Sequence, residues 1–317
     1  MHWIIFGMAA LAVALGLFLA SGGKLIALEQ VDFPKDALEK LIIAEPLEAE
    51  LTLSGPLEVH VSSPWTRWAM KLLPGTFLVD VKINGRKASL VVDTGAAKTF
   101  IGPKLAVAAQ VDLTSSRLIV QYGRRETPVY MGWVRELELG DLRVHNLPII
   151  VGGTQPVLKL VGLSIWNLDG LLGIDVLQKL ALTLDYEREV VILRRESPPL
   201  GAPSAPLQIL REQGPEGLEH PKPLVDGFVD GSGPFPCFID TGTSAPVFVP
   251  KEIWQALGLE GKRQARLQIR VGEIDLKEVF AIPANVKYIT IGSNIFQAQG
   301  IKRLTLDFLG GKLYAER

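Results

Sequence analysis

The feature that most constrains this chain is a duplicated Asp-Thr-Gly triplet, at Asp93–Gly95 and again at Asp240–Gly242. The flanking residues match without a gap, since VVDTGAAKTFIGPK (91–104) can be laid over FIDTGTSAPVFVPK (238–251) at a constant offset of 147 residues. Chance would give about 0.06 such triplets in a chain of this composition. Each copy shows an apolar strand pattern, the triplet, a second strand pattern and a Pro-Lys helix start. The chain is therefore predicted to contain two related units.

Both units show the pattern of β structure. Short apolar runs separated by turn signals predict a mostly β fold with few helices. Downstream, LDGLLGIDVL and LTLDYEREVVIL in the first copy match YITIGSNIF and LTLDFLGGKLYA in the second. The segment Ser197–Pro206 is rich in proline, as is typical of a linker. We expect one unit at 75–196, a linker at 197–206 and a second unit at 207–317.

The N-terminal residues 1–23 carry no ionisable side chain except His2 and are long enough to span a bilayer. An uncleaved membrane anchor is expected, and a cleaved signal peptide and a buried core helix are the alternatives. Basic residues follow this segment and none precedes it, which by the positive-inside rule favours a cytoplasmic body. The side of the membrane stays open at this point.

Residues 24–74 form a separate region in this interpretation. The stretch 34–45 has helical spacing, and 47–61 alternates like a β-hairpin around Ser54–Pro56. The region is expected to be a juxtamembrane stalk, a removable propeptide, or additional strands of the first unit.

Composition excludes several other functions. The chain has 33 basic and 34 acidic side chains, so no charge excess points to nucleic acid. Cys237 is the only cysteine and the four histidines lack ligand spacing, which disfavours a disulfide, a zinc site and a Ser-His-Asp mechanism. No cofactor and no metal are expected. Paired carboxylates remain as the candidate chemistry.

Two aspartates brought together by the repeat would have a defined chemistry. Two anionic carboxylates about 4 Å apart repel by roughly 4 kcal/mol at an effective dielectric constant near 20. This corresponds to about 3 pK units, so the pair is expected to share one proton near neutral pH. The ionised member can take a proton from a water while the neutral member hydrogen-bonds a carbonyl group.

This arrangement resembles the aspartic protease family over about Gly75–Arg317. The resemblance implies a mostly β acid protease fold with two pseudo-twofold-related, retropepsin-like β-barrel lobes, here behind an N-terminal transmembrane helix. It implies Asp93 and Asp240 as catalytic residues. Asp93–Ala96 is similar to the retropepsin motif, and Asp240–Thr243 is similar to the second-lobe motif of pepsin.

The same resemblance implies roles for the residues beside the aspartates. Thr94 and Thr241 would hydrogen-bond across the pseudo-twofold axis. Gly95 and Gly242 would allow close backbone approach and present N–H donors. Thr243 would offer its aspartate a hydroxyl, so the two carboxylates should not be equivalent.

The resemblance also implies a flap, a hairpin that closes over the bound peptide. The first copy contains LIVQYGRRETPVY (118–130), which is typical of a hairpin with its turn near 123–127, and Tyr122 and Gly123 would contact substrate. An ordinary surface hairpin is the alternative. The second copy has only a shorter stretch there, so we expect one flap, from the first lobe.

The predicted function is that of an aspartic endopeptidase acting on a peptide or protein substrate. A single chain with both aspartates does not require an oligomer. Membrane attachment would use residues 1–23, and the family resemblance favours an extracytoplasmic catalytic domain. The alternative is a non-catalytic peptide-binding module on the same scaffold.

Overall fold

The structure, a computed structural model, describes residues 26–30, 49–60, 74–122, 125–152, 154–160, 163–167, 169–199, 201–213 and 219–317. The predicted membrane segment at 1–23 and the helical pattern at 34–45 lie outside these ranges. Within them, no helix has the length and apolar character needed to cross a bilayer. The membrane anchor therefore stays a prediction.

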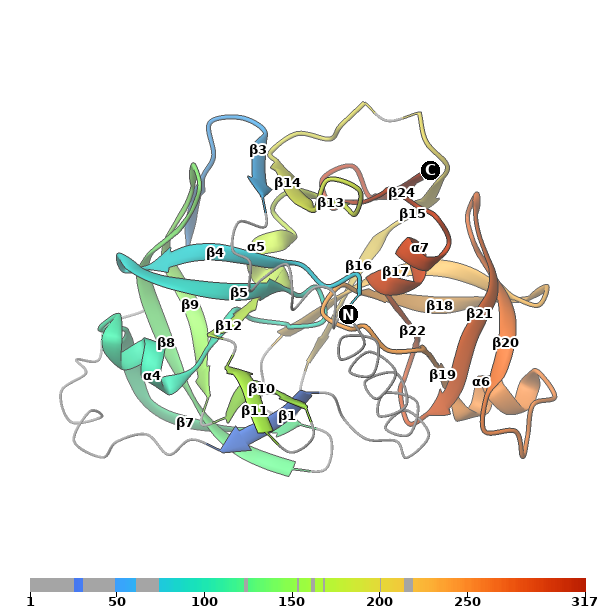
Figure 1. Cartoon of the computed structure of the whole chain (residues 1–317), viewed down its shortest axis with the longest axis horizontal. Coiled ribbons are helices and arrows are strands. Elements are labelled where there is room, and N and C mark those ends of the chain that lie inside the picture. Colours follow the sequence, from blue (N-terminus) through green and yellow to red (C-terminus); the bar gives the residue numbers. More distant parts are fainter. Residues whose placement is uncertain are drawn as a thin grey trace, which may run out of the picture.

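Two closed β-barrels of six strands each make up the lobes, which lie left and right in Figure 1. The strands of the first barrel are β4 (Leu78–Ile83), β5 (Arg86–Val92), β6 (Phe100–Ile101), β8 (Arg125–Leu139), β9 (Leu142–Gly152) and β12 (Gly170–Leu172). Those of the second are β17 (Glu219–Val229), β18 (Ser232–Asp240), β19 (Val247–Pro250), β20 (Ala265–Val271), β21 (Ile274–Ala284) and β22 (Ile289–Gly292).

The two barrels have the same strand order. In the first, neighbours run β9-β6-β12-β5-β4-β8 and β8 closes on β9; in the second they run β21-β19-β22-β18-β17-β20 and β20 closes on β21. In each barrel the strand that leads into Asp-Thr-Gly pairs in parallel with a short strand, β5 with β12 and β18 with β22. The prediction of a mostly β fold with two similar barrels is confirmed.

A six-stranded antiparallel sheet joins the lobes at the top of Figure 1. Its strands are β3 (Leu57–His60), β13 (Ala181–Asp185), β14 (Val190–Arg194), β15 (Ser204–Pro206), β23 (Arg303–Asp307) and β24 (Lys312–Glu316). At its centre β13 pairs with β23, with Thr183 opposite Thr305, and the two hydroxyl oxygens are 2.8 Å apart. Because both threonines come from the repeated LTLD sequence, this contact lies on the pseudo-twofold axis.

The predicted hairpin at 47–61 is wrong in its pairing. Both halves are strands, but β2 (Glu50–Thr52) pairs with β9 in the first lobe, whereas β3 pairs with β14 in the joining sheet. Alternation of apolar and polar residues identifies a strand but not its partner. A stalk, a propeptide and additional strands were the three expectations for residues 24–74. The described strands between Glu50 and His60 fit the last of these.

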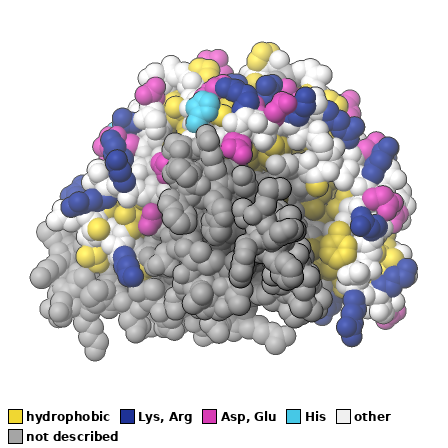
Figure 2. All heavy atoms as spheres, viewed as in Figure 1, with side chains coloured by type: hydrophobic (Ala, Val, Ile, Leu, Met, Phe, Trp, Pro, Cys, Tyr) yellow, Lys and Arg dark blue, Asp and Glu magenta, His cyan; other side chains and the backbone are white. Residues whose placement is uncertain are grey.

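The other elements extend or cap this frame. The remaining strands are β1 (Ile26–Gln30), β7 (Asp112–Tyr122), β10 (Thr154–Leu160), β11 (Leu163–Asn167) and β16 (Gln208–Gln213), and the helices are α4 (Pro103–Ala108), α5 (Ile174–Leu177), α6 (Lys251–Ala256) and α7 (Ser293–Ala298). Acidic and basic side chains are interspersed over the described surface visible in Figure 2, in keeping with the near-zero net charge. The fold thus places the two Asp-Thr-Gly loops where the barrels meet.

Candidate active site

The two Asp-Thr-Gly loops hold each other through four reciprocal hydrogen bonds. Thr94 Oγ1 donates to the Ile239 carbonyl at 2.8 Å, and the Thr94 N–H donates to Thr241 Oγ1 at 3.0 Å. The second loop repeats this, since Thr241 Oγ1 donates to the Val92 carbonyl at 2.8 Å and its N–H to Thr94 Oγ1 at 3.0 Å. Both threonines are fully buried. The loops are therefore fixed face to face, as the family resemblance implies.

Thr94→Val is expected to lower the free energy of unfolding by about 3 kcal/mol. The variant keeps the shape of the side chain but leaves the Thr241 N–H and the Ile239 carbonyl without their buried partner. Urea unfolding followed by circular dichroism measures the loss. Thr52→Val, on the exposed face of β2, is the control and should change the value by no more than about 0.5 kcal/mol. Equal unfolding midpoints for both variants would contradict a stabilising role of the Thr94 hydrogen bonds.

The structure brings the carboxyl groups of Asp93 and Asp240 together, and they hydrogen-bond to each other. Asp93 follows β5 and Asp240 ends β18, and each turns into a loop that the opposite glycine approaches. A Cβ atom on Gly95 would lie 2.7 Å from Asp240 Oδ1, and one on Gly242 would lie 2.2 Å from Asp93 Cγ. Only glycine leaves room for the opposite carboxyl at these two positions.

The two carboxyls have unequal hydrogen-bond donors. Asp93 Oδ1 accepts the N–H groups of Gly95 at 2.8 Å and Ala96 at 3.1 Å, whereas Asp240 Oδ1 accepts the Gly242 N–H at 3.0 Å. The structure shows no hydrogen bond from the Thr243 hydroxyl to Asp240 among the described residues. The predicted inequality is present, but a backbone N–H at Ala96 produces it rather than a threonine hydroxyl.

Burial raises the pKa of both carboxyls. The pKa of Asp240 rises to about 8, through burial first and then through the negative charge of Asp93. The pKa of Asp93 is also raised by burial, but its two backbone N–H donors oppose that effect because they stabilise the anion. The second backbone N–H donor therefore favours the anion of Asp93 over that of Asp240.

Next to the two loops lie residues that the sequence analysis missed, and they support the two loops in different ways. Thr99 donates its N–H at 3.0 Å and its hydroxyl at 2.9 Å to Asp175. In the second lobe Pro246 takes the place of Thr99 and has no N–H, and Asn294 takes the place of Asp175 and donates to the Ala245 carbonyl at 3.2 Å. The sequence signal for this difference is the alignment of GIDVL with GSNIF. In it Asp175 is replaced by Asn294, in the same lobe in which Pro246 replaces the hydrogen-bond donor Thr99.

The hairpin predicted at 118–130 is present. Strands β7 and β8 pair up to Tyr122 opposite Arg125, so the turn is tighter than the predicted 123–127. Gly123 lies outside the described residues. No described strand of the second lobe corresponds to β7 in the order of the sheet. Roles for Tyr122 and Gly123 in substrate contact stay predictions.

The single cysteine of the chain is not part of the dyad site. Cys237 is fully buried in the second barrel, and burial raises the pKa of its thiol to about 12, so it is a structural residue.

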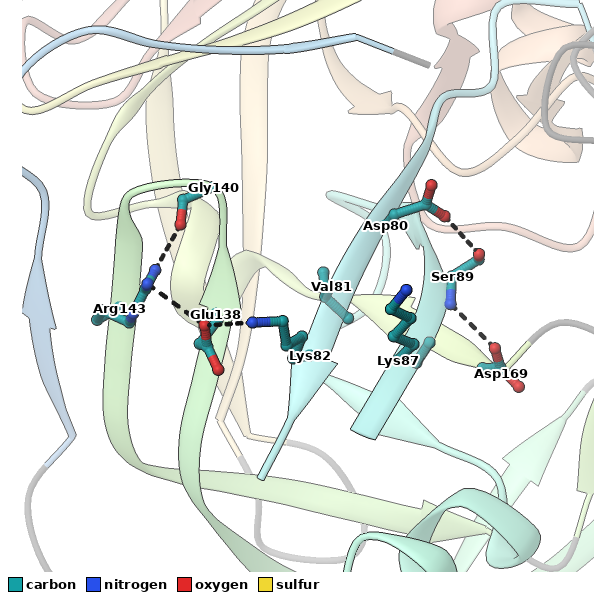
Figure 3. A pocket seen from close by; sticks show the side chains of 10 residues that line it. Asp80, Val81, Lys82, Lys87, Ser89, Glu138, Gly140, Arg143 and Asp169 are labelled. Atoms are coloured by element: carbon teal, nitrogen blue, oxygen red, sulfur yellow. Dashed lines mark hydrogen bonds and ion pairs between the residues drawn. The ribbon is translucent and has the colours of Figure 1, made fainter. Parts of the chain in front are cut away.

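A cavity of about 530 Å³ lies on the outer side of β4 and β5 and is drawn in Figure 3. Glu138 pairs there with both Lys82 and Arg143, and Ser89 donates hydrogen bonds to Asp80 and Asp169. This cavity does not include either aspartate of the dyad.

Comparison with known proteins agrees with this geometry. Residues 79–176, from β4 to α5, match the family described as "Aspartyl protease". A stretch of 121 residues, 38% of the chain, is 28% identical to the protein named "DNA damage-inducible protein 1" from Neurospora crassa. The chain matches only 26% of the length of that relative. The family match covers the first lobe, and the second lobe repeats the strand order and the loop of the first. These matches support an aspartic protease family for the chain, of the retropepsin-like type.

Proposed function

We propose that the chain is an aspartic endopeptidase that hydrolyses peptide bonds with a water activated between Asp93 and Asp240. The observation that carries the proposal is the pair of mutually hydrogen-bonded carboxyls with unequal donors. Asp93, the ionised member, would take a proton from the water. Asp240 would donate its proton to the carbonyl oxygen of the scissile bond as the water oxygen bonds to the carbon. When the C–N bond then breaks, Asp93 would pass the water proton to the leaving amine and Asp240 would take back a proton from the diol hydroxyl. Because water attacks directly, no covalent intermediate with the protein forms.

The substrate would be a peptide segment in an extended conformation. The β7–β8 hairpin supports this proposal, since a single long hairpin from the first lobe can cover a strand that lies between the lobes. Tyr122 and Gly123 would contact the substrate at its tip. A peptide or protein is therefore the proposed partner, and the proposed anchor at 1–23 would hold the enzyme at a membrane.

The proposal is tested with the full chain and a mixed peptide library, with new peptide termini identified by mass spectrometry. The wild type is expected to cleave peptides. The control Asp141→Asn, which changes an exposed turn residue of the first lobe, should cleave them equally well. If no peptide is cleaved at any pH while peptides still bind, the chain is instead a peptide-binding module on the protease scaffold.

The pH dependence of kcat/KM is expected to be bell-shaped. Above about pH 8 the rate falls because Asp240 loses the shared proton, since its pKa is raised to about 8. At low pH the rate falls because Asp93 is protonated. This limb of the profile lies above pH 3.8, the ordinary pKa of an aspartate, because burial raises the pKa of Asp93 as well. Initial rates on one peptide across this range test both limbs. A rate that keeps rising beyond about pH 9 would contradict the shared proton.

A further inference from the structure

Strand β17 brings a lysine to the side of the second lobe that carries Asp240. Along β17, Pro221, Pro223 and Val225 are buried, and Lys222 and Leu224 point to the other face. Leu224 pairs with Phe238, which precedes Asp240 by two residues on β18. Because side chains two apart on a strand share a face, Phe238 and Asp240 point the same way. Lys222 therefore belongs to the face of the dyad and not to the barrel interior.

The lysine contacts the aromatic ring that precedes Asp240 by two residues. Its Nζ lies 5.0 Å from the centroid of the Phe238 ring, within the range of a cation–π contact. Its positive charge also acts on Asp240, whose pKa it lowers against the larger effect of burial. Lys222 is half-buried, so water screens this charge less than it would screen that of an exposed lysine.

No carboxylate neutralises Lys222 among the residues that the structure describes. Glu212 feels its charge, but the Glu212 carboxylate already pairs with Lys287 and accepts the Tyr288 hydroxyl at 2.5 Å. Asp240 keeps its proton below about pH 8 and then offers no charge of its own. The ammonium group therefore has an aromatic ring as a neighbour and lacks an anionic partner.

The first lobe has no cation at the corresponding place. Leu78-Val79-Asp80 on β4 and Leu224-Val225-Asp226 on β17 are equivalent segments, because Leu78 pairs with Val91 as Leu224 pairs with Phe238. Two residues earlier, the first lobe has Thr76, which is buried and uncharged, where the second has Lys222. At this pair of equivalent positions, the second lobe therefore carries one positive charge that the first lacks.

We propose that Lys222 is a specificity-determining residue that makes the enzyme favour substrates with an acidic side chain next to the scissile bond, on the Asp240 side. The proposal rests on the proposed function, since it assumes that the face of Asp240 binds the substrate. A carboxylate there would form the ion pair that Lys222 lacks. For a pair partly removed from water, a preference of about tenfold over the uncharged amide is expected.

The test uses matched peptides that carry Glu, Gln or Lys at each of the two positions beside the scissile bond. For the wild type, kcat/KM should be about tenfold higher with Glu than with Gln at one of these positions. The ratio should fall to about one in Lys222→Met and below one in Lys222→Glu, which should instead favour the Lys peptide. Lys222→Arg should keep the preference. Lys277→Met, an exposed lysine of the same lobe, should keep the wild-type ratio.

The same peptides are also tested for binding to the wild type by fluorescence anisotropy. Equal kcat/KM for Glu and Gln peptides in the wild type overturns the role of Lys222 and leaves proteolysis standing, even where a variant fails to fold. A preference that survives Lys222→Met overturns it too. Tighter binding of Glu peptides without cleavage would support Lys222 and count against the proposed protease activity; equal binding without cleavage would overturn both.

Discussion

Asp93→Asn and Asp240→Asn are each expected to lower kcat/KM for a cleavable peptide by about 10³-fold or more. Asp93→Asn removes the base, because an amide cannot accept the proton of the attacking water. Asp240→Asn removes the shared proton, because an amide can donate a hydrogen bond to the scissile carbonyl but cannot transfer a proton to it. The two groups act as one unit, so the double variant should be little slower than either single variant. Progress curves with a fluorogenic peptide measure all three.

Unfolding experiments separate lost chemistry from lost structure in these variants. The pKa of Asp240 is higher in the folded protein than the ordinary value of 3.8, so the folded state binds an extra proton between about pH 4 and 8. That contribution to stability is complete below about pH 4 and is lost as the pH rises through about 8. The amide introduced by Asp240→Asn does not titrate, so this variant should lose less stability than the wild type over the same interval. An unchanged rate in either single variant would contradict the water mechanism.

The sequence predicted the dyad because the repeat carries its geometry. Similar sequences at an offset of 147 residues fold into similar loops, and the pseudo-twofold arrangement of the lobes brings these loops face to face. The cross-axis bonds of Thr94 and Thr241 follow from the same symmetry. The fold class followed from the alternation of apolar residues and the turn signals, which report on local structure directly.

What escaped prediction depends on partners distant in the chain. The strand character of 50–60 was predictable, but the split of β2 and β3 between two sheets was not, because both have the same alternation. The second donor to Asp93 is a backbone N–H at Ala96, which any residue type except proline would supply. Lys222 was missed for a related reason: its neighbour Phe238 lies on the next strand and meets it only through strand pairing.

Gly242→Ala is expected to lower kcat/KM by about 10²-fold while the protein stays folded. The added Cβ would lie 2.2 Å from Asp93 Cγ, so the carboxyl must move away. This carboxyl is the end of a side chain and can move aside for the methyl group, but it then loses its hydrogen bonds from the Gly95 and Ala96 N–H groups, so the variant stays folded and is less stable. Catalysis does not accommodate the methyl group, because a displacement of about 1 Å at the reacting groups costs on the order of 10²-fold in rate.

The control for this variant is Gly201→Ala, where an added Cβ would meet nothing within 4 Å. It should match the wild type in both rate and unfolding midpoint. Gly95→Ala gives the mirror experiment, since its Cβ would lie 2.7 Å from Asp240 Oδ1. A larger loss for Gly242→Ala than for Gly95→Ala is expected because its contact is shorter and falls on Asp93, the member that must accept the proton of the water. If Gly242→Ala cleaves peptides at the wild-type rate, the two loops do not face each other as the structure has them, and the shared-proton mechanism fails with them.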